Sequence, residues 1–400
     1  MNQQSTRKVA AILAIGLFVF AHLTAGTAFF GDPPDAHHPW AVHDRNRPLP
    51  ERVEPAARIG DPPSDAIVLF DGTEASFREN WRHVSQPDRR KADWTVQDGY
   101  MLVVPGAGSI ETIQMFGDCQ LHVEWSHEHA LPGLGQGRGN SGVFLPGGVE
   151  VQILDNYNNP TYADGTAGAV YGVMPPAVNA LRPPGQWQSY DIIYRRPIVK
   201  DGEVIDTGSL TVLMNGVVVQ DATPLEGGGG WRKRQPYNRE FPELGALSFQ
   251  DHGDPVRFRN VWYRPLRPRP SQGGFDGRIS TGAAMTKRAE IAAQLRQEAA
   301  GDSGVERMLL LLESIYYKTD ASALEEAEQL AQAYLQELQS ASDETLKTRK
   351  GQVRKVYQAL RYMQHFGYLP DGYAVISELE SLMASPGLNM EAFLRNFRVR

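Results

Sequence analysis

The sequence predicts a β-sandwich of the jelly-roll type, followed by a small bundle of helices. Between about residues 66 and 265, short apolar runs alternate with turn residues, and almost no helical periodicity interrupts them. From residue 281 onwards, the apolar residues recur at helical spacing instead. A chain of 400 residues favours about two domains, so we place the sandwich at 65–267, a linker at 268–280 and a helical domain at 281–400.

The N-terminus has the layout of a secretory signal peptide. Arg7 and Lys8 precede the apolar run 9–20, and small residues follow that run. We therefore expect residues 1–28 to be cleaved off and the protein to be exported to the periplasm or the extracellular space. The alternative is an uncleaved anchor, because the apolar run could extend towards Phe30, although its length falls short of a comfortable membrane span.

Composition and charge limit the classes of function. The contents of 41% hydrophobic and 22% charged residues are those of a globular protein, and a formal net charge of −7 argues against general nucleic-acid binding. The single cysteine, Cys119, rules out an internal disulfide and a cysteine-based zinc cluster, and its neighbours place it in a strand. Residues 29–64, rich in Pro, Asp, His and Arg, are predicted to form an extended linker. Beyond them no stretch is apolar enough for stable membrane insertion after cleavage.

Each strand of the predicted sandwich is a short apolar run that ends at turn residues. Asp98-Gly99 and Asn215-Gly216 are strong two-residue turn signals. The runs that we assign to strands are 67–70, 94–96, 100–104, 120–125, 143–145, 149–154, 190–194, 210–214, 217–219, 247–252 and 256–263.

One predicted hairpin has a clear polar face. Its two apolar runs, 143–145 and 149–154, are separated by Pro-Gly-Gly. In the second run, alternation with period 2 places Val151 on one face and both Glu150 and Gln152 on the other. One face is therefore expected to pack in the core, while the other displays chemically active groups.

Two further strands repeat this pattern. His122 and Glu124 alternate with apolar residues in one run, and Gln250 and His252 do so in another. An ordinary solvated strand face carries mainly Lys, Thr and Ser, whereas these strands carry carboxylate, amide and imidazole groups. We expect these side chains to share one face with Glu150 and to line a groove.

The loop 227–240 holds four glycines followed by Trp231, Arg232, Lys233 and Arg234. It lacks the Gly-Lys-Ser/Thr ending of a phosphate-binding loop, and no strand-to-helix pattern surrounds it. We interpret it as a mobile surface loop, with a lid over the groove as the alternative.

The last 120 residues or so carry amphipathic stripes typical of a small helical bundle. They contain no haem-attachment, metal-helix or nucleotide motif. We interpret residues 281–400 as a supporting domain or as a docking domain for a partner protein. The stripes comprise Met285, Ile291 and Leu295; Met308, Leu311, Leu312 and Ile315; Leu324, Ala327, Leu330, Tyr334 and Leu338; and Val353, Val356, Leu360 and Met363.

Several motifs of the sandwich come in the order and spacing of one known family. They are Leu69-Phe70-Asp71-Gly72, Trp94 to Gly99, Gly117-Asp118, His122-Val123-Glu124-Trp125, Asn140-Ser141-Gly142-Val143-Phe144, Val149-Glu150-Val151-Gln152-Ile153-Leu154-Asp155, Gly168-Ala169-Val170-Tyr171-Gly172, Trp187, Phe249-Gln250-Asp251-His252-Gly253 and Phe258-Arg259-Asn260-Val261-Trp262. Together they resemble the 3-keto-disaccharide hydrolase domain family, a concanavalin A-like jelly roll. The resemblance covers roughly residues 66–266 and excludes the helical tail, and the loop 227–240 resembles an insertion.

The resemblance implies an enzyme for glycosides whose sugar already carries a ketone at carbon 3, acting by hydrolysis or by elimination and rehydration. The ketone acidifies the proton on carbon 2, so a carboxylate or His can abstract it, and the resulting enolate expels the group on carbon 1. We expect Glu150 to be the base. His252 is expected to be the acid or the enolate donor, because imidazole changes charge near neutral pH. Glu124 and Asp155 are the reserve carboxylates.

Other residues are expected to hold the carbohydrate substrate. Asn140, Gln152 and Gln250 would bind sugar hydroxyls, with Tyr171 or Trp187 as an aromatic wall.

Structural alternatives exist for three of the catalytic assignments. Asp155 could cap the turn before Asn156, Glu124 could pair with a buried Arg such as Arg259, and His252 could only brace a loop.

Three alternatives to the enolate mechanism remain open at this point. A direct glycosidase would need two carboxylates about 5 to 10 Å apart across the bond. A divalent metal ion could assist enolisation through His and carboxylate ligands, although no cofactor is established. A lectin-like module would use the same groove to bind glycans without turnover, with the helical tail docking a partner.

Overall fold

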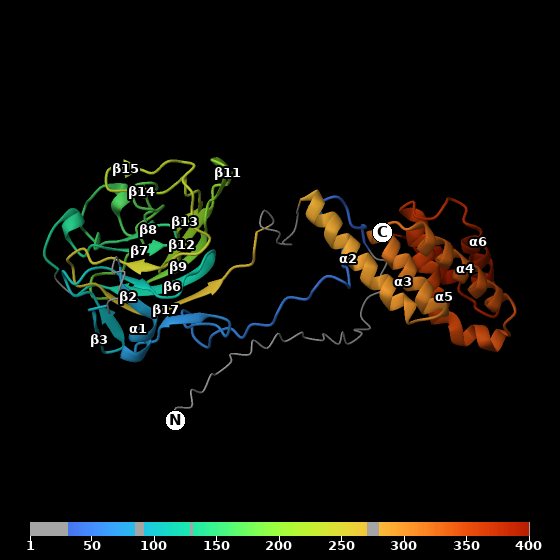
Figure 1. The fold of residues 1–400 in the computed structure, drawn as a ribbon. Coiled ribbons are helices and arrows are strands. Elements are labelled where there is room, and N and C mark those ends of the chain that lie inside the picture. Colours follow the sequence, from blue (N-terminus) through green and yellow to red (C-terminus); the bar gives the residue numbers. More distant parts are fainter. Residues whose placement is uncertain (1–30, 85–91, 129–130, 270–279, 400) are drawn as a thin grey trace, which may run out of the picture. The chain divides into compact units, whose positions relative to one another are not determined.

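The computed structural model describes residues 31–84, 92–128, 131–269 and 280–399 (Figure 1). The predicted signal peptide therefore lies outside the described residues. The chain divides into two compact units. The first unit is Glu51–Arg267, and the second is Pro268–Arg400 together with the N-terminal residues up to Pro50.

The first unit, here called the β unit, is built from short strands. The large sheet contains β1 (Ile67–Phe70), β3 (Thr95–Gln97), β4 (Tyr100–Leu102), β6 (Cys119–Ser126), β9 (Gln188–Arg195), β12 (Ser209–Met214), β13 (Val217–Thr223) and β17 (Arg257–Pro265). The small sheet contains β2 (Trp81–His83), β5 (Ile110–Thr112), β7 (Ser141–Leu145), β8 (Val149–Ile153) and β16 (Ser248–Phe249). Two further hairpins are β10 (Ile198–Lys200) with β11 (Glu203–Asp206) and β14 (Gly229–Gly230) with β15 (Lys233–Arg234).

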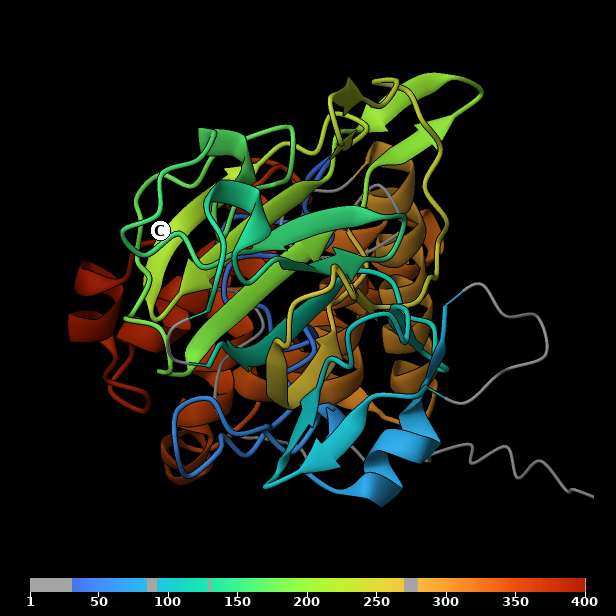
Figure 2. The ribbon, with the colours of Figure 1, turned by 90° about the vertical axis from the view of Figure 1, so that its left-hand side faces the viewer.

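The two sheets lie in two layers, and their strand pairs are antiparallel (Figures 1 and 2). The large sheet has the order β13-β12-β9-β6-β17-β4-β3, with β1 paired to β17, and the small sheet has the order β2-β5-β16-β7-β8. Neighbouring strands are therefore often distant in sequence. This arrangement confirms the predicted β-sandwich.

One apolar core fills the space between the sheets. Trp125 of the large sheet and Val151 of the small sheet are both fully buried in it. Phe249 of β16 stacks on Phe258 of β17, with ring centroids 4.3 Å apart and planes 6° apart. Such a pair contributes about 0.5–1.5 kcal/mol beyond its area burial, and here it joins the two sheets directly. Cys119 is also buried in this core, as its predicted strand position indicated.

The β unit also contains a helix that the apolar pattern did not predict, α1 (Glu74–Asn80). The side chain of Thr73 accepts a hydrogen bond from the backbone N–H of Ser76 at 3.1 Å and caps the helix start. Phe77 is buried against the core. Seven residues make only two turns, which is too short for a helical period to be recognised.

The second unit, here called the helical unit, confirms the helices predicted after residue 281. Its helices α2, α4 and α5 begin after Ser280, Asp320 and Ser342, whose side chains accept backbone N–H groups of the first turn. Within the described ranges, none of the helices is both long enough and apolar enough to cross a bilayer. The helices are α2 (Thr281–Ala300), α3 (Gly304–Tyr317), α4 (Ala321–Gln339), α5 (Asp343–His365), α6 (Ala374–Ala384) and α7 (Glu391–Asn396).

Part of the predicted linker 29–64 is folded onto these helices. Arg45 Nε donates to Glu313 Oε1 on α3 at 2.9 Å, and Asn46 Nδ2 donates to the same oxygen at 2.7 Å. Tyr362 on α5 donates its hydroxyl to the Gly31 carbonyl at 2.8 Å. The prediction of an extended linker is therefore wrong for this stretch. The stretch is held by polar contacts to partners more than 260 residues away along the chain. Contacts of this kind do not require a periodic pattern of apolar residues, so no such pattern marks them in the sequence.

Arg45→Gln should destabilise the helical unit by about 1–3 kcal/mol, because it leaves the Glu313 carboxylate buried without its cation. Burial raises the pKa of Glu313 above its usual 4.5. The loss of folding stability caused by Arg45→Gln should therefore be small below about pH 4.5, where Glu313 is protonated in folded and unfolded chains. It should grow as the pH rises. Urea unfolding at about pH 4 and about pH 7.5 measures it.

The double variant Arg45→Gln/Glu313→Gln is the control for this pair. It should recover most of the stability at the higher pH, since no buried charge is left unpaired. Equal losses for the single and double variants at both pH values would contradict the charge-pair explanation.

Candidate active site

The outward side of the small sheet forms a polar face on one side of the β unit. In the register of β7 and β8, Gly142 lies opposite Gln152 and Phe144 lies opposite Glu150. The residues between them point into the core. Ser248 of β16 lies beside Phe144 on the other side. We call this surface the small-sheet face; it comprises Gly142, Phe144, Glu150, Gln152, Ser248 and Gln250.

Glu150 lies low on this face, over a glycine. A Cβ atom on Gly142 would lie 2.4 Å from Glu150 Oε1, so only glycine leaves room for the carboxyl group. The Gln152 amide, in the orientation that satisfies its own hydrogen bonds, donates to Glu150 Oε1 at 3.0 Å and to the Ser141 carbonyl at 3.1 Å. Removal from water raises the pKa of Glu150 to about 8. The carboxyl group is therefore mainly protonated at neutral pH, and its ionised form is a stronger base than an ordinary carboxylate.

Gln250 and His252 follow the end of β16, the middle strand of the small sheet. The Gln250 backbone N–H donates to the Gly142 carbonyl at 3.1 Å, and this bond holds Gln250 beside the glycine that the Glu150 carboxyl group lies over. Its side-chain Oε1 is buried and has no hydrogen-bond partner among the described residues. Two residues on, His252 is exposed at the rim of the sheet. The adjacent Asp251 carboxylate holds this turn by accepting the backbone N–H groups of Gly108 and Gly253.

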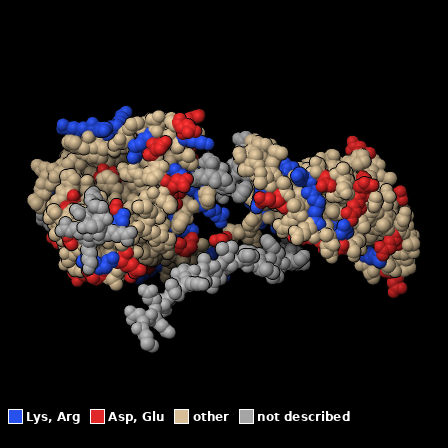
Figure 3. Space-filling view, viewed as in Figure 1, with Lys and Arg blue, Asp and Glu red and all other residues tan. Residues whose placement is uncertain are grey.

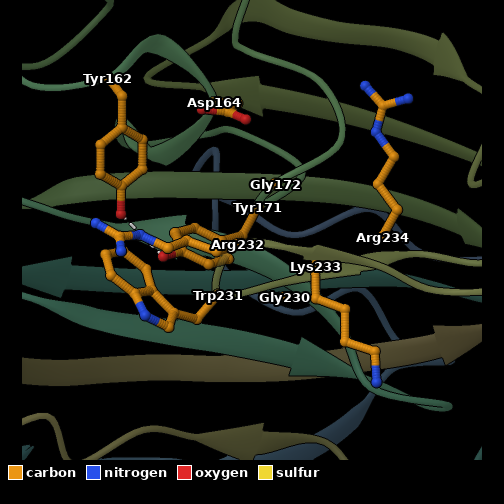
Figure 4. Close-up of a pocket in the computed structure, with 9 residues that line it drawn as sticks. All are labelled: Tyr162, Asp164, Tyr171, Gly172, Gly230, Trp231, Arg232, Lys233 and Arg234. Atoms are coloured by element: carbon orange, nitrogen blue, oxygen red, sulfur yellow. Dashed lines mark hydrogen bonds between the residues drawn. The ribbon is translucent and has the colours of Figure 1, made fainter.

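Two tyrosines stand beside Glu150. The Tyr171 backbone N–H donates to the Glu150 carbonyl at 3.1 Å, and the Tyr171 hydroxyl lies 2.9 Å from that of Tyr162. Burial and this hydrogen bond raise the pKa of Tyr162, and the Glu150 charge contributes a smaller part. With Trp231 they line a cavity of about 400 Å³ (Figure 4). The surface is hollowed in this region, next to a band of Lys and Arg (Figure 3).

Asn140, Gln152 and Asp155 are engaged in internal contacts. Asn140 Nδ2 donates to the Gln136 carbonyl at 2.9 Å, and Gln152 is almost wholly buried. Asp155 forms an ion pair with Arg138 at 3.1 Å and accepts the Tyr157 backbone N–H at 3.2 Å. The structure therefore favours the capping alternative for Asp155.

Glu124 lies on the opposite side of the sandwich. Leu121, Val123 and Trp125 of β6 fill the core, so His122 and Glu124 point away from it on the outer side of the large sheet. The expectation that these residues share one face with Glu150 is therefore wrong. The period-2 pattern determines which side chains of a strand share a face. It does not determine which of the two sheets the strand joins, and therefore on which side of the molecule that face lies.

The large sheet holds Glu124 in a network of charges. Arg259 Nε donates to Glu124 Oε2 at 2.6 Å and Asn260 Nδ2 donates to Oε1 at 2.9 Å, as the pairing alternative for Glu124 expected. Although burial opposes it, the nearby His122 imidazole and hydrogen bonds from Asn260 and Arg259 lower the pKa of Glu124 to about 2. Burial likewise opposes the shift of His122, whose pKa is raised to about 9 by its hydrogen bond to Asp191 and by the nearby charge of Glu124, whose Oε1 lies 3.7 Å from His122 Nε2.

Trp187 belongs to the same outer side as Glu124. The Arg259 guanidinium lies 4.1 Å from the centre of its ring, and the centre of the Tyr100 ring lies 6.0 Å from it. Trp187 precedes β9, whose inward residues Tyr190 and Ile192 are buried in the core. It is therefore not an aromatic wall for the small-sheet face; Tyr162 and Tyr171 occupy that place.

Comparison with known proteins identifies the family. The model of the 3-keto-alpha-glucoside-1,2-lyase-like domain matches residues 65–264. The chain belongs to this family. A 3-keto-disaccharide hydrolase of Bacteroides thetaiotaomicron is 26% identical over 244 residues, covering 50% of this chain and 78% of that protein. A crystal structure from Parabacteroides distasonis, provisionally described as a glycosyl hydrolase, has 41% identity and a TM-score of 0.51, and covers 56% of this chain and 94% of that one.

The family domain thus coincides with the β unit, and the names of its relatives indicate a glycosyl hydrolase. Sequence reasoning missed Gly142, Phe144 and Tyr162 as parts of its candidate site. For Gly142 a signal existed, because a glycine inside a strand marks a close approach of another group. No group of three or more His, Cys, Asp or Glu side chains in the described ranges is arranged to hold a metal ion. A metal-assisted route therefore stays an untested alternative.

Glu150→Gln should change how the stability of the family domain depends on pH. The folded-state pKa of Glu150 is about 8 and its usual value is 4.5, so between these values the folded chain holds a proton that the unfolded chain has lost. The wild-type protein should lose stability as pH rises through this window, whereas Glu150→Gln has no proton to lose there. Urea unfolding at about pH 5 and about pH 8.5 measures the difference. A variant that follows the wild type in parallel at both pH values would contradict the raised pKa.

Proposed function

We propose that the β unit cleaves 3-keto-glycosides at the small-sheet face, with Glu150 as the base that removes the proton on carbon 2. The observation that carries this proposal is the setting of Glu150. Its carboxyl group lies over Gly142 beside the Tyr162–Tyr171 wall, and its desolvation raises its pKa to about 8. General bases work best when their pKa lies near the operating pH, and ordinary carboxylates fall well below it. Family membership supports the substrate class.

The proposed reaction is an elimination followed by addition of water. The ionised Glu150 takes the proton from carbon 2, and the electron pair of that C–H bond moves into an enolate on the oxygen at carbon 3. The enolate then reforms the ketone and expels the glycosidic oxygen from carbon 1, leaving a double bond between carbons 1 and 2. The departing oxygen takes up a proton. Addition of water across this double bond completes a net hydrolysis.

His252 and Gln250 are assigned the supporting roles in this scheme. His252 is exposed at the rim, where an imidazolium can donate a proton to the departing oxygen or to the enolate. Among the described residues Gln250 Oε1 has no hydrogen-bond partner, although a buried acceptor of this kind is normally satisfied. A sugar hydroxyl would satisfy it once the buried amide turns towards the face. Asn140 and Gln152 position the groups around them, and Tyr171 forms the aromatic wall.

Glu124, Asp155 and Trp187 receive no role in this reaction. Glu124 and Trp187 lie on the outer side of the large sheet, where both contact Arg259. Asp155 forms an ion pair with Arg138. Export after removal of residues 1–28 and docking of a partner protein on residues 281–400 stay predictions of the sequence.

Glu150→Gln should lower kcat for release of 3-ketoglucose from a 3-keto disaccharide by about 100- to 10,000-fold, because the amide cannot accept the proton. Wild-type kcat/KM should rise with pH up to about 8, as Glu150 ionises in the free enzyme. Chromatography of the products, with detection of the unsaturated intermediate, measures both. Binding of the disaccharide without any turnover by the wild type would favour the lectin-like alternative. Normal turnover by Glu150→Gln would exclude Glu150 as the base.

Gly142→Ala should reduce kcat while the fold is retained, because the new Cβ would lie 2.4 Å from Glu150 Oε1 and must displace the carboxyl group. The matched control is Gly137→Ala in the nearby loop, where an added Cβ meets no atom within 4 Å. We expect at least a tenfold loss for Gly142→Ala and a change within about twofold for the control. Thermal unfolding checks that both variants fold. Equal kcat values in the two variants would contradict the placement of Glu150.

A further inference from the structure

The loop 227–240 forms an ordered hairpin beside the small-sheet face. Gly229 and Gly230 of β14 pair with Arg234 and Lys233 of β15. An added Cβ on Gly229 would lie 2.2 Å from the Tyr171 carbonyl oxygen, so the two backbones are in direct contact. Because the Tyr171 N–H bonds to the Glu150 carbonyl, the hairpin lies next to the strand that carries the proposed base.

The hairpin and the tyrosine wall enclose the cavity of about 400 Å³ described above, which lies within the range of small-ligand sites. Tyr162 lies 6.3 Å from Trp231, measured between ring centroids, and the two rings with Tyr171 form an aromatic group (Figure 4). Trp231 is 63% exposed, which is a large apolar surface to leave in water. The cavity therefore has the aromatic surface that a sugar ring can pack against.

The same cavity is lined by three cations, Arg232, Lys233 and Arg234. In the described parts of the chain none of the three side chains forms an ion pair or a hydrogen bond, and only Asp164 supplies a carboxylate to the lining. Arg232 lies in the turn of the hairpin, over the Trp231 ring at 4.8 Å and next to the aromatic group, whereas Lys233 and Arg234 extend from β15 (Figure 4). The formal net charge of the chain is −7, so these three neighbouring cations have the opposite sign to the chain as a whole.

We propose that this cavity is a subsite for a saccharide unit that carries an anionic group, such as a uronate carboxylate or a sulfate ester, at the leaving-group side of the bond. This inference rests on the proposed function and adds its substrate class. The planar guanidinium of Arg232 can bind a carboxylate or a sulfate with two parallel hydrogen bonds, and Lys233 and Arg234 add attraction at longer range. The aromatic group would hold the ring of the same unit.

Three substrates with the same 3-keto-glucosyl unit test this proposal: one linked to glucose, one to glucuronate and one to glucose 6-sulfate. The wild type should show a higher kcat/KM for one or both anionic substrates than for the neutral one, and added salt should reduce this preference. The variant Arg232→Gln/Lys233→Gln/Arg234→Gln should lower the ratio of anionic to neutral kcat/KM about tenfold, the effect of losing one charge-assisted contact.

The matched control is Lys347→Gln/Lys350→Gln/Lys355→Gln on α5 of the helical unit, which removes the same number of charges and should leave the ratio unchanged. A wild type without preference, or a hairpin variant with an unchanged ratio, would overturn the subsite. If only the glucuronate or only the sulfate substrate is preferred, that result identifies the anionic group.

A binding experiment separates this inference from the proposed reaction. Glucosyl-glucose, glucosyl-glucuronate and glucosyl-glucose 6-sulfate, without the ketone, are titrated into the full chain by calorimetry. Tighter binding of an anionic disaccharide that is lost in the hairpin variant supports the subsite even if no 3-keto sugar is turned over. Equal binding of all three would overturn the subsite and leave the proposal for Glu150 untouched.

Discussion

The shared core between two sheets is the constraint on which the rest of the β unit depends. Every strand of the two sheets must give one set of alternate side chains to that core, as the stacked rings of Phe249 and Phe258 show for one strand of each sheet. The other set can then only face outward. Because packed sheets lie about 10 Å apart, the two outer faces are separated by the whole thickness of the sandwich. Polar groups on different sheets therefore cannot cooperate, however similar their sequence patterns are.

Two glutamates illustrate what this separation does to chemistry. Glu124 lies among Arg259, Asn260 and His122, which stabilise its charge and lower its pKa to about 2. No cation of the described residues pairs with Glu150, and burial raises its pKa to about 8. The same carboxyl group is thus a fixed charge on one side of the molecule and a group that ionises near neutral pH on the other. Environment, not residue type, assigns the two roles.

Glycine controls how closely other groups approach the proposed active site. Gly142 makes room for the Glu150 carboxyl group, and Gly229 lets the cationic hairpin contact the backbone of Tyr171. At both positions the lack of a Cβ atom allows another group to come close, and neither glycine adopts the positive φ that a special turn would require. Close approaches at these two glycines therefore position the proposed catalytic group and the proposed anionic subsite, whereas the hairpin residues Arg232 and Trp231 are exposed.

The sequence by itself determined the strands of the large sheet, the helical tail and the polar side of the β7–β8 hairpin, because alternation and helical period are local properties of a chain. It also showed the family, through motifs spread over residues 66–266. Only the tertiary structure decided that Glu124 and Trp187 face away from Glu150, that residues 31–50 pack on the helices, and that the hairpin reaches Tyr171. Those facts depend on partners far apart in the chain, such as Glu124 and Arg259, 135 residues apart. No local period records such pairings, since they arise only when the sheets close around their common core.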